Sequence, residues 1–222
     1  MARSDELIKK CIVDQMTRDD RVDASGISTE VSSGTVTLSG EVPTYFARSA
    51  AHEVAEDTAG VLDVQNNLVV NYPDFIPVPP DSEIQEALKH RFLTNPDIDL
   101  RKVEVDVNDG SVILRGTVNA YWKKMRAQEL AANEPGVVSI DNHIAVVTTD
   151  DYLDKALAEN IVNSLEAKAL VNAEDVTVKV QEGEVTLKGM VPNWSALRAA
   201  EDAVLYNPGI TNVINLVTVS NF

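Results

Sequence analysis

The stretch GTVTLSGEV at residues 34–42 decides the fold, because the chain contains it three times in closely related form. It returns as GSVILRGTV at residues 110–118 and as GEVTLKGMV at residues 183–191, so the copies are offset by 76 and then 73 residues. Self-similarity at a nearly fixed spacing is the signature of a repeat architecture. The sequence therefore predicts three tandem copies of one small unit.

Each copy predicts two strands joined by a tight turn. Within the motif, apolar and polar residues alternate, which is typical of a strand with one covered face. Another apolar stretch precedes each motif, at residues 27–31, 103–107 and 176–180. The few residues between the two strands end in the first glycine of the motif, and glycine supplies the positive φ that a short hairpin turn needs.

The rest of the unit follows from the residues after each motif. Eighteen residues beyond the final valine stands a further glycine, Gly60, Gly136 or Gly209, which is expected to end a helix of about 15 residues. An extended apolar tail then predicts a third strand, and an amphipathic segment ahead of each hairpin predicts a leading helix. The fold class is thus α+β: three tandem αββαβ two-layer units, each a three-stranded mixed sheet with two helices on one face.

The third inward position of the second predicted strand is glycine in all three copies, at Gly40, Gly116 and Gly189. An isolated glycine in a strand often marks the close approach of another segment. We expect the covering helix to make this approach.

The predicted domains are repeat 1 at residues 1–70, repeat 2 at 82–147 and repeat 3 at 152–222. The first joint, residues 71–81, holds four prolines and should form a stiff, extended spacer. The second joint, residues 148–151, is short. We expect repeats 2 and 3 to form a compact pair, with repeat 1 set further off.

Composition excludes several classes of protein. The net charge of −16 argues against nucleic-acid binding, whose affinity comes from Lys and Arg on phosphates. The single cysteine, Cys11, cannot form an internal disulfide. No apolar run reaches the roughly 20 residues of a membrane span. Residues 1–20 are charged and lack the apolar region of a signal peptide, so the sequence as it stands indicates the cytoplasm, or the periplasm if an export signal has been removed.

No pattern in the sequence indicates catalysis. The three histidines, His52, His90 and His143, lie in different segments, and none has a metal-ligand spacing. There is no phosphate-binding loop, nucleophile elbow or calcium loop. We therefore expect a non-enzyme without catalytic residues, metal site or cofactor.

Aromatic residues recur at one corner of each repeat, just after the second strand: Tyr45-Phe46, Tyr121-Trp122 and Trp194. Two interpretations are open. The rings could close one end of the core, or they could be exposed anchors, because Trp and Tyr favour the zone between water and lipid.

Charge is unevenly distributed among the repeats. Residues 1–70 hold 6 basic and 12 acidic residues, residues 82–149 hold 8 and 10, and residues 150–222 hold 5 and 11. The basic residues of the middle repeat cluster beside its aromatic pair and could hold an anionic surface if they share a face; the alternative is an ordinary solvated face with salt bridges. The candidate lipid- or partner-binding set is Lys89, Arg91, Arg101, Lys102, Tyr121, Trp122, Lys123, Lys124 and Arg126.

The repeated pattern resembles the BON (bacterial osmotic-shock and nodulation) family. The residues that carry the resemblance are Gly34 to Val42, Gly60-Val61 and Val64, with their counterparts in the other copies. The resemblance implies an αββαβ fold and a role in bacterial envelope or osmotic-stress proteins, with attachment to phospholipid membranes. It leaves open two alternatives: a soluble protein-interaction or chaperone-like stress protein, and a protein that responds to a cation such as potassium. The family motif contains no catalytic side chain.

Overall fold

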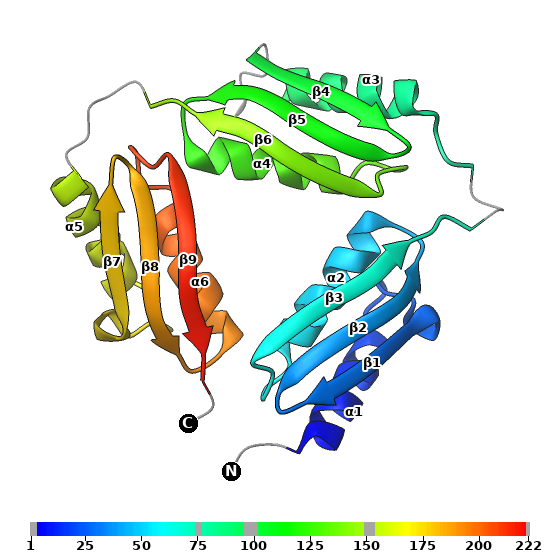
Figure 1. The fold of residues 1–222 in the computed structure, drawn as a ribbon, viewed down its shortest axis with the longest axis horizontal. Coiled ribbons are helices and arrows are strands. Elements are labelled where there is room, and N and C mark those ends of the chain that lie inside the picture. Colours follow the sequence, from blue (N-terminus) through cyan, green and yellow to red (C-terminus); the bar gives the residue numbers. More distant parts are fainter. Residues whose placement is uncertain (1–3, 74–76, 96–101, 149–153, 221–222) are drawn as a thin grey trace.

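The computed structural model describes residues 4–73, 77–95, 102–148 and 154–220. Each repeat has the order helix, strand, strand, helix, strand, which confirms the predicted fold class (Figure 1). Repeat 1 comprises α1 (Asp5–Met16), β1 (Ile27–Ser32), β2 (Thr35–Val42), α2 (Tyr45–Asp57) and β3 (Asp63–Val70). Repeat 2 comprises α3 (Asp81–Thr94), β4 (Val103–Asn108), β5 (Ser111–Val118), α4 (Tyr121–Ala132) and β6 (Ser139–Val146). Repeat 3 comprises α5 (Asp154–Glu166), β7 (Val176–Gln181), β8 (Glu184–Val191), α6 (Trp194–Leu205) and β9 (Asn212–Val219).

The motif strand is the centre of each sheet. In repeat 1, β2 pairs antiparallel with β1 and parallel with β3, and β5 and β8 do the same in their own sheets. Because β2 and β3 are parallel, α2 crosses from one end of the sheet to the other and packs on the face that α1 also covers. The opposite face of every sheet is left open (Figure 1).

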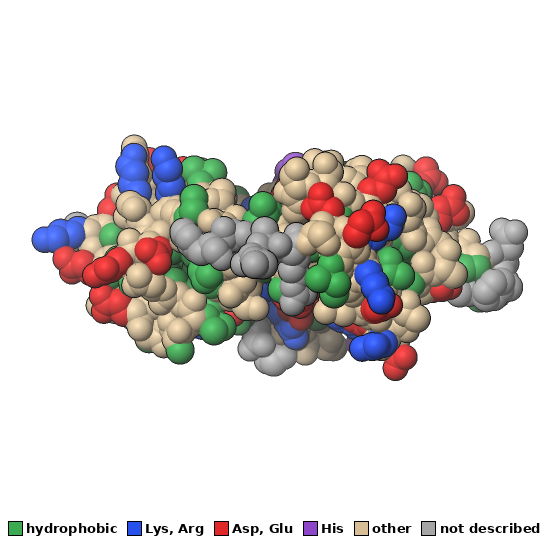
Figure 2. Space-filling model, turned by 90° about the horizontal axis from the view of Figure 1, so that it is seen from below, with side chains coloured by type: hydrophobic (Ala, Val, Ile, Leu, Met, Phe, Trp, Pro, Cys, Tyr) green, Lys and Arg blue, Asp and Glu red, His purple; other side chains and the backbone are tan. Residues whose placement is uncertain are grey.

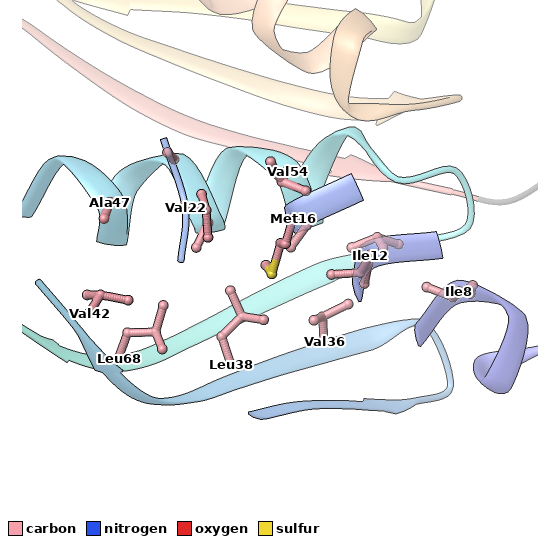
Figure 3. Close-up of a cluster of buried hydrophobic side chains, with 14 of the residues drawn as sticks. Ile8, Ile12, Met16, Val22, Val36, Leu38, Val42, Ala47, Val54 and Leu68 are labelled. Atoms are coloured by element: carbon pink, nitrogen blue, oxygen red, sulfur yellow. The ribbon is translucent and has the colours of Figure 1, made fainter. Parts of the chain in front are cut away.

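The core of each unit lies between the sheet and its two helices. In repeat 1, α1 contributes one buried residue per turn, Ile8, Ile12 and Met16, and the motif strand contributes Val36 and Leu38 (Figure 3). Complete burial of a side chain of this size contributes about 1.5–3 kcal/mol relative to exposure. The same pattern recurs in repeats 2 and 3, so each unit has its own core.

The hairpin turn of each repeat is held by a carboxylate from the leading helix. Ser33 and Gly34 both have positive φ, 52° and 81°, as a two-residue type I′ turn requires. The side chain of Asp5, the first residue of α1, accepts hydrogen bonds from both turn amides, at 2.8 Å from Ser33 and 3.1 Å from Gly34. Asp81 and Asp154 bind the turns of the other two repeats in the same way.

The same turn also fixes the start of the third strand. The carbonyl of Gly34 accepts a hydrogen bond of 2.8 Å from the amide of Leu62. A Cβ on Gly34 would lie 2.9 Å from the Leu62 side chain and 3.1 Å from the carbonyl oxygen of Gly60. The turn therefore joins α1, both hairpin strands and the segment that leads into β3, and only glycine fits there.

The reason we expected for the glycines inside the motif strand is wrong. A Cβ on Gly40 would lie 2.1 Å from the carbonyl oxygen of Gly26, which is backbone just ahead of β1, and Gly40 has a φ of +117°. The same clash, with the carbonyl of Lys102 or Asp175, would occur at Gly116 and Gly189. The close approach thus comes from the backbone that leads into the neighbouring strand, and the covering helix is not responsible.

The three repeats lie at the corners of a flat triangle (Figure 1). Their sheets face one side of the triangle and their helices face the other. The second helix of each unit, α2, α4 or α6, lies along the inner edge of the triangle. This corrects the expected placement of repeat 1, because α2 contacts α6 of repeat 3. The proline content of residues 71–81 predicts that the segment is stiff, but it does not predict the direction in which the segment leads the chain. Part of each joint, residues 74–76 and 149–151, lies outside the described residues.

We expect Asp5→Ala to lower the free energy of unfolding of repeat 1 by about 1–3 kcal/mol, because the turn amides lose their charged acceptor. Urea unfolding followed by circular dichroism measures this. Asp14→Ala, at an exposed position of the same helix, is the matched control and should change stability by less than about 0.5 kcal/mol. Equal effects of the two substitutions would show that the carboxylate does not hold the turn.

Candidate functional site

The recurring aromatic corner forms the joints between repeats. Tyr45, the first residue of α2, packs against the cores of both repeat 1 and repeat 2. Tyr121, at the equivalent position of α4, packs against the core of repeat 3. Trp194, at the equivalent position of α6, donates a hydrogen bond of 3.1 Å from its indole nitrogen to the carbonyl of Val61 in repeat 1. Each repeat thus docks on the next in cyclic order, and the third contact closes the ring.

The joint between repeats 1 and 2 includes a tyrosine of the proline-rich segment. The hydroxyl of Tyr72 accepts a hydrogen bond of 2.8 Å from the amide of Gly136 and donates to the carbonyl of Val137 at 3.4 Å. Burial raises the pKa of Tyr72, and the hydrogen bond from Gly136 opposes this shift. Val138 adds apolar contact with the core of repeat 1.

The joint between repeats 3 and 1 contains ion pairs in addition to the hydrogen bond of Trp194. The guanidinium of Arg198 lies 3.0 Å from a carboxylate oxygen of Glu56 and 3.0 Å from one of Asp57, both at the end of α2. Burial raises the pKa of Glu56, but its hydrogen bond with His52 and its ion pair with Arg198 together leave this pKa below the usual value. The carboxylate of Glu56 therefore stays ionised at neutral pH and remains a partner for Arg198.

The joint between repeats 2 and 3 carries the most conspicuous surface cluster. The rings of Trp122 and Tyr206 have centroids 6.4 Å apart, and Nζ of Lys123 lies 5.4 Å from the centroid of the Trp122 ring. Tyr206, which follows α6, is 71% exposed. Sequence analysis missed this residue, although a signal was present: the equivalent positions hold Asp57 and Asn133, so only repeat 3 has an aromatic ring there.

A cavity of about 260 Å³ lies beside this cluster, between α4 and repeat 3. Its walls combine apolar side chains, among them Tyr121 and Leu205, with the carboxylates of Glu201 and Asp202. Burial, with a smaller contribution from Glu201, raises the pKa of Tyr121. Tyr121 of the predicted binding set is thus half-buried between two repeats.

The structure divides the predicted basic set into several groups. Arg91 of α3 forms an ion pair with Glu134, and Arg126 of α4 forms one with Glu129. Lys123 and Lys124 lie next to Trp122 at the start of α4 and are half-buried. Lys102 is exposed just ahead of β4, and Arg101 lies outside the described residues.

Lys89 stands apart from the α4 group but in the same helix layer, since α3 and α4 pack side by side on one face of their sheet. It borders a cavity of about 380 Å³ between α3 and β4. Leu93, one helical turn further along α3, also lines this cavity and is 69% exposed. The helix layer of repeat 2 thus places Lys89 beside the exposed Leu93, and Lys123 beside the half-buried Trp122 and the exposed Tyr206 of repeat 3.

Neither metal-binding clusters nor membrane-spanning helices are found in the described ranges. No group of three or more His, Cys, Asp and Glu side chains in those ranges could hold a metal ion. In the same residues, no helix combines the length and the apolar character that crossing a bilayer demands.

The repeated αββαβ unit with glycines at the hairpin and ahead of the third strand defines a small two-layer module used in tandem. The BON domain matches residues 4–72, 80–148 and 153–221. The chain therefore belongs to the BON domain family and carries three of these domains, which confirms the resemblance seen in the sequence.

Two relatives show the kind of protein in which similar domains occur. The chain is 29% identical over 140 residues to osmotically-inducible protein Y of Escherichia coli (strain K12), across 62% of this chain and 68% of that protein. It is 26% identical over 135 residues to a 21 kDa hemolysin of Actinobacillus pleuropneumoniae, across 60% of this chain and 69% of that protein.

Among solved structures, CdsD of the type III secretion system of Chlamydia trachomatis aligns with 98% of this chain and 93% of its own length, at 15% identity and a TM-score of 0.28. A score this low carries no argument about function.

We expect the double variant Trp194→Phe/Arg198→Gln to open the ring, because it removes both the indole hydrogen bond and the ion pairs that join repeat 3 to repeat 1. Small-angle X-ray scattering should show a larger radius of gyration and a longer maximum dimension than the unaltered chain. Arg115→Gln is the matched control, since Arg115 pairs with Asp106 inside repeat 2. Identical scattering from all three proteins would contradict closure by these contacts.

Proposed function

We propose that the protein is a non-catalytic module that associates with anionic phospholipid membranes in a bacterial osmotic-stress role, with the helix layer of repeat 2 as the contact. The observation that carries the proposal is the Trp122–Tyr206 ring pair with Lys123 beside it. A ring pair with the exposed Tyr206, the half-buried Trp122 and a cation beside them suits the boundary between lipid and water, where Trp and Tyr rings are enriched.

The charges around this cluster support the same assignment. A lysine close to an anionic membrane surface contributes about 1 kcal/mol. Lys123 and Lys124 provide such charges on α4, and Lys89 provides another on α3 beside the exposed Leu93. Arg91 and Arg126 are engaged by carboxylates of their own repeat and contribute less.

The distribution of charge among the repeats favours repeat 2 as the contact. Repeat 2 has 8 basic and 10 acidic residues, whereas repeats 1 and 3 have a larger acidic excess. The helices of all three repeats lie on the side opposite the open sheet faces (Figure 1). The helices also carry carboxylates, and α4 carries fewer of them than any other helix, with Glu129 alone. Screening over a Debye length of about 8 Å weakens the repulsion between the membrane and the carboxylates of repeats 1 and 3.

The osmotic-stress part of the proposal rests on the family and on the similarity to osmotically-inducible protein Y. The family and this relative support the physiological role of the protein, whereas the surface of repeat 2 supports the identity of what the protein binds.

We expect the intact protein to float with vesicles that contain anionic phospholipid at low salt, and to float less at moderate salt, because screening weakens the attraction of lysines to the surface. The variant Lys89→Gln/Lys123→Gln/Lys124→Gln should lose most of this binding. Vesicles of neutral phospholipid alone should not recruit the protein.

The matched control replaces three lysines outside repeat 2, Lys9→Gln/Lys155→Gln/Lys168→Gln, with the same change in net charge. Equal binding by both variants would remove repeat 2 as the contact. No flotation under any condition would refute membrane association and favour a protein-interaction or cation-responsive role; suppression of client aggregation without lipid would point to the first, and a melting temperature that differs between potassium and sodium to the second.

A further inference from the structure

The open sheet face of repeat 3 differs from those of its two sister repeats at equivalent positions. Ile214, Leu216 and Met190 point to the open side of β9 and β8, and all three are exposed, Leu216 by 53% and Met190 by 48%. The equivalent residues of repeat 1 are Gln65, Asn67 and Glu41, and those of repeat 2 are Asp141, His143 and Thr117. Since the same fold accommodates polar residues there twice, folding does not require the aliphatic ones.

The charge at one position of this face is reversed as well. Lys179 of β7 stands where repeats 1 and 2 have Glu30 and Asp106. Lys188 of β8 lies between the two strands and pairs in register with Leu216. Both lysines are exposed, and neither forms an ion pair within the described part of the chain. The face therefore combines an aliphatic centre with unpaired positive charge, although Glu184 lies at its far end.

The open sheet face of repeat 1 has the complementary character. Glu30, Glu41 and Asp63 come from its three strands, and the basic residues of repeat 1 all lie outside these strands. Val69 is also exposed on this face, next to Glu41 in the strand register. The acidic face of repeat 1 thus matches the lysines of repeat 3 and offers one apolar side chain to its aliphatic centre.

Both faces look toward the same side of the flat molecule, so they cannot meet within one chain (Figure 1). Figure 2 views the triangle along its plane, with the sheet side upward: basic side chains project upward over repeat 3, and acidic side chains gather over repeat 1. A planar anionic surface on this side would meet both patches at once and would be repelled by the second.

We propose that two copies of this chain associate through their sheet sides, with repeat 3 of each copy on repeat 1 of the other. A two-fold axis that lies between the two copies, parallel to the line from repeat 2 to the middle of the opposite edge, places repeat 3 of each copy over repeat 1 of the other. Both complementary contacts then form at the same time, and the assembly closes as a dimer instead of growing into a filament. An apolar centre with a charged rim is the usual composition of such an interface.

The net charge of −16 on each copy opposes association at long range. At physiological ionic strength the Debye length is about 8 Å, so distant charges are screened while lysine–carboxylate contacts across the interface are affected less. The association is therefore tested at about 0.15 M salt.

The test is sedimentation velocity and equilibrium of the full chain over a wide range of protein concentration. We expect the average mass to rise with concentration from 24.2 kDa toward twice that value, and no further. Lys179→Glu/Lys188→Glu should abolish the rise. Lys155→Glu/Lys168→Glu changes the net charge equally outside the sheet face and should leave the rise unchanged.

A charge exchange distinguishes the proposed pairing from a general effect of charge. Adding Glu30→Lys/Glu41→Lys to Lys179→Glu/Lys188→Glu restores opposite charges across the interface and the original net charge, so the dimer should return. Ile214→Gln/Leu216→Asn introduces the residues that repeat 1 carries at these positions and should weaken the dimer at least tenfold without changing the circular dichroism spectrum.

Three results would overturn the proposal: a mass of one chain at every concentration, association that the sheet-face variants leave intact, or failure of the exchanged charges to restore the dimer. If the chain stays monomeric and Ile214→Gln/Leu216→Asn instead reduces flotation with anionic vesicles, the face binds lipid. Loss of membrane binding by the repeat 2 lysine variant would leave the dimer untouched, so the two proposals fail separately.

Discussion

A pair of hydrogen bonds from the hairpin turn to one aspartate holds each repeat together. The carboxylate of Asp5 binds the amides of Ser33 and Gly34, and the carbonyl of Gly34 binds the amide of Leu62. Through these contacts the first helix, the antiparallel pair and the parallel strand meet at one point. A unit of about 65 residues buries a small core, so contacts that fix the relative position of its layers matter more than they would in a large domain. The two positive φ values of the turn are possible because this network offsets their strain.

The same point of each repeat also receives its neighbour. Val61, one residue before Leu62, is the residue whose carbonyl accepts the indole hydrogen bond of Trp194. Tyr72 binds the equivalent place in repeat 2, at Gly136 and Val137. The aromatic residues that dock, Tyr45, Tyr121 and Trp194, occupy matching positions in the three repeats, and the sites that receive Trp194 and Tyr72 match in repeats 1 and 2. The joints are thus heterologous contacts repeated around the ring. Such contacts either close or continue indefinitely. Here closure is at the third contact, where Arg198 supplies ion pairs with Glu56 and Asp57.

Much of the unit could be predicted from the sequence, because its rules are local. The alternation of apolar and polar residues along residues 34–42 indicates a strand, and glycines at fixed distances mark the turn and the end of the second helix. Because the same pattern occurs three times, a chance match is negligible. The carboxylate at the turn was missed, although Asp5, Asp81 and Asp154 occupy equivalent positions, because its partner lies 28 residues away and no spacing rule connects a helix start with a hairpin tip. The reason for Gly40 was wrong because strand register, which brings the carbonyl of Gly26 against it, is a tertiary property. The placement of the repeats relative to one another could not be predicted from the sequence either, because it also depends on tertiary contacts.

The candidate surfaces show why repeated domains are informative without any other sequence for comparison. Three units with one fold serve as internal controls: positions that the fold requires, such as Leu38 and its counterparts, remain apolar in each of them. An exposed position is free to vary, so a residue that differs in character from both counterparts reports on something other than folding. By this criterion Tyr206 and Leu216 stand out, one beside the helix layer of repeat 2 and the other on the open sheet face of repeat 3. The two divergent residues thus lie on opposite sides of the ring, one on the helix side and one on the sheet side. Because the shared fold separates these two sides, each can bind its own partner without disturbing the other.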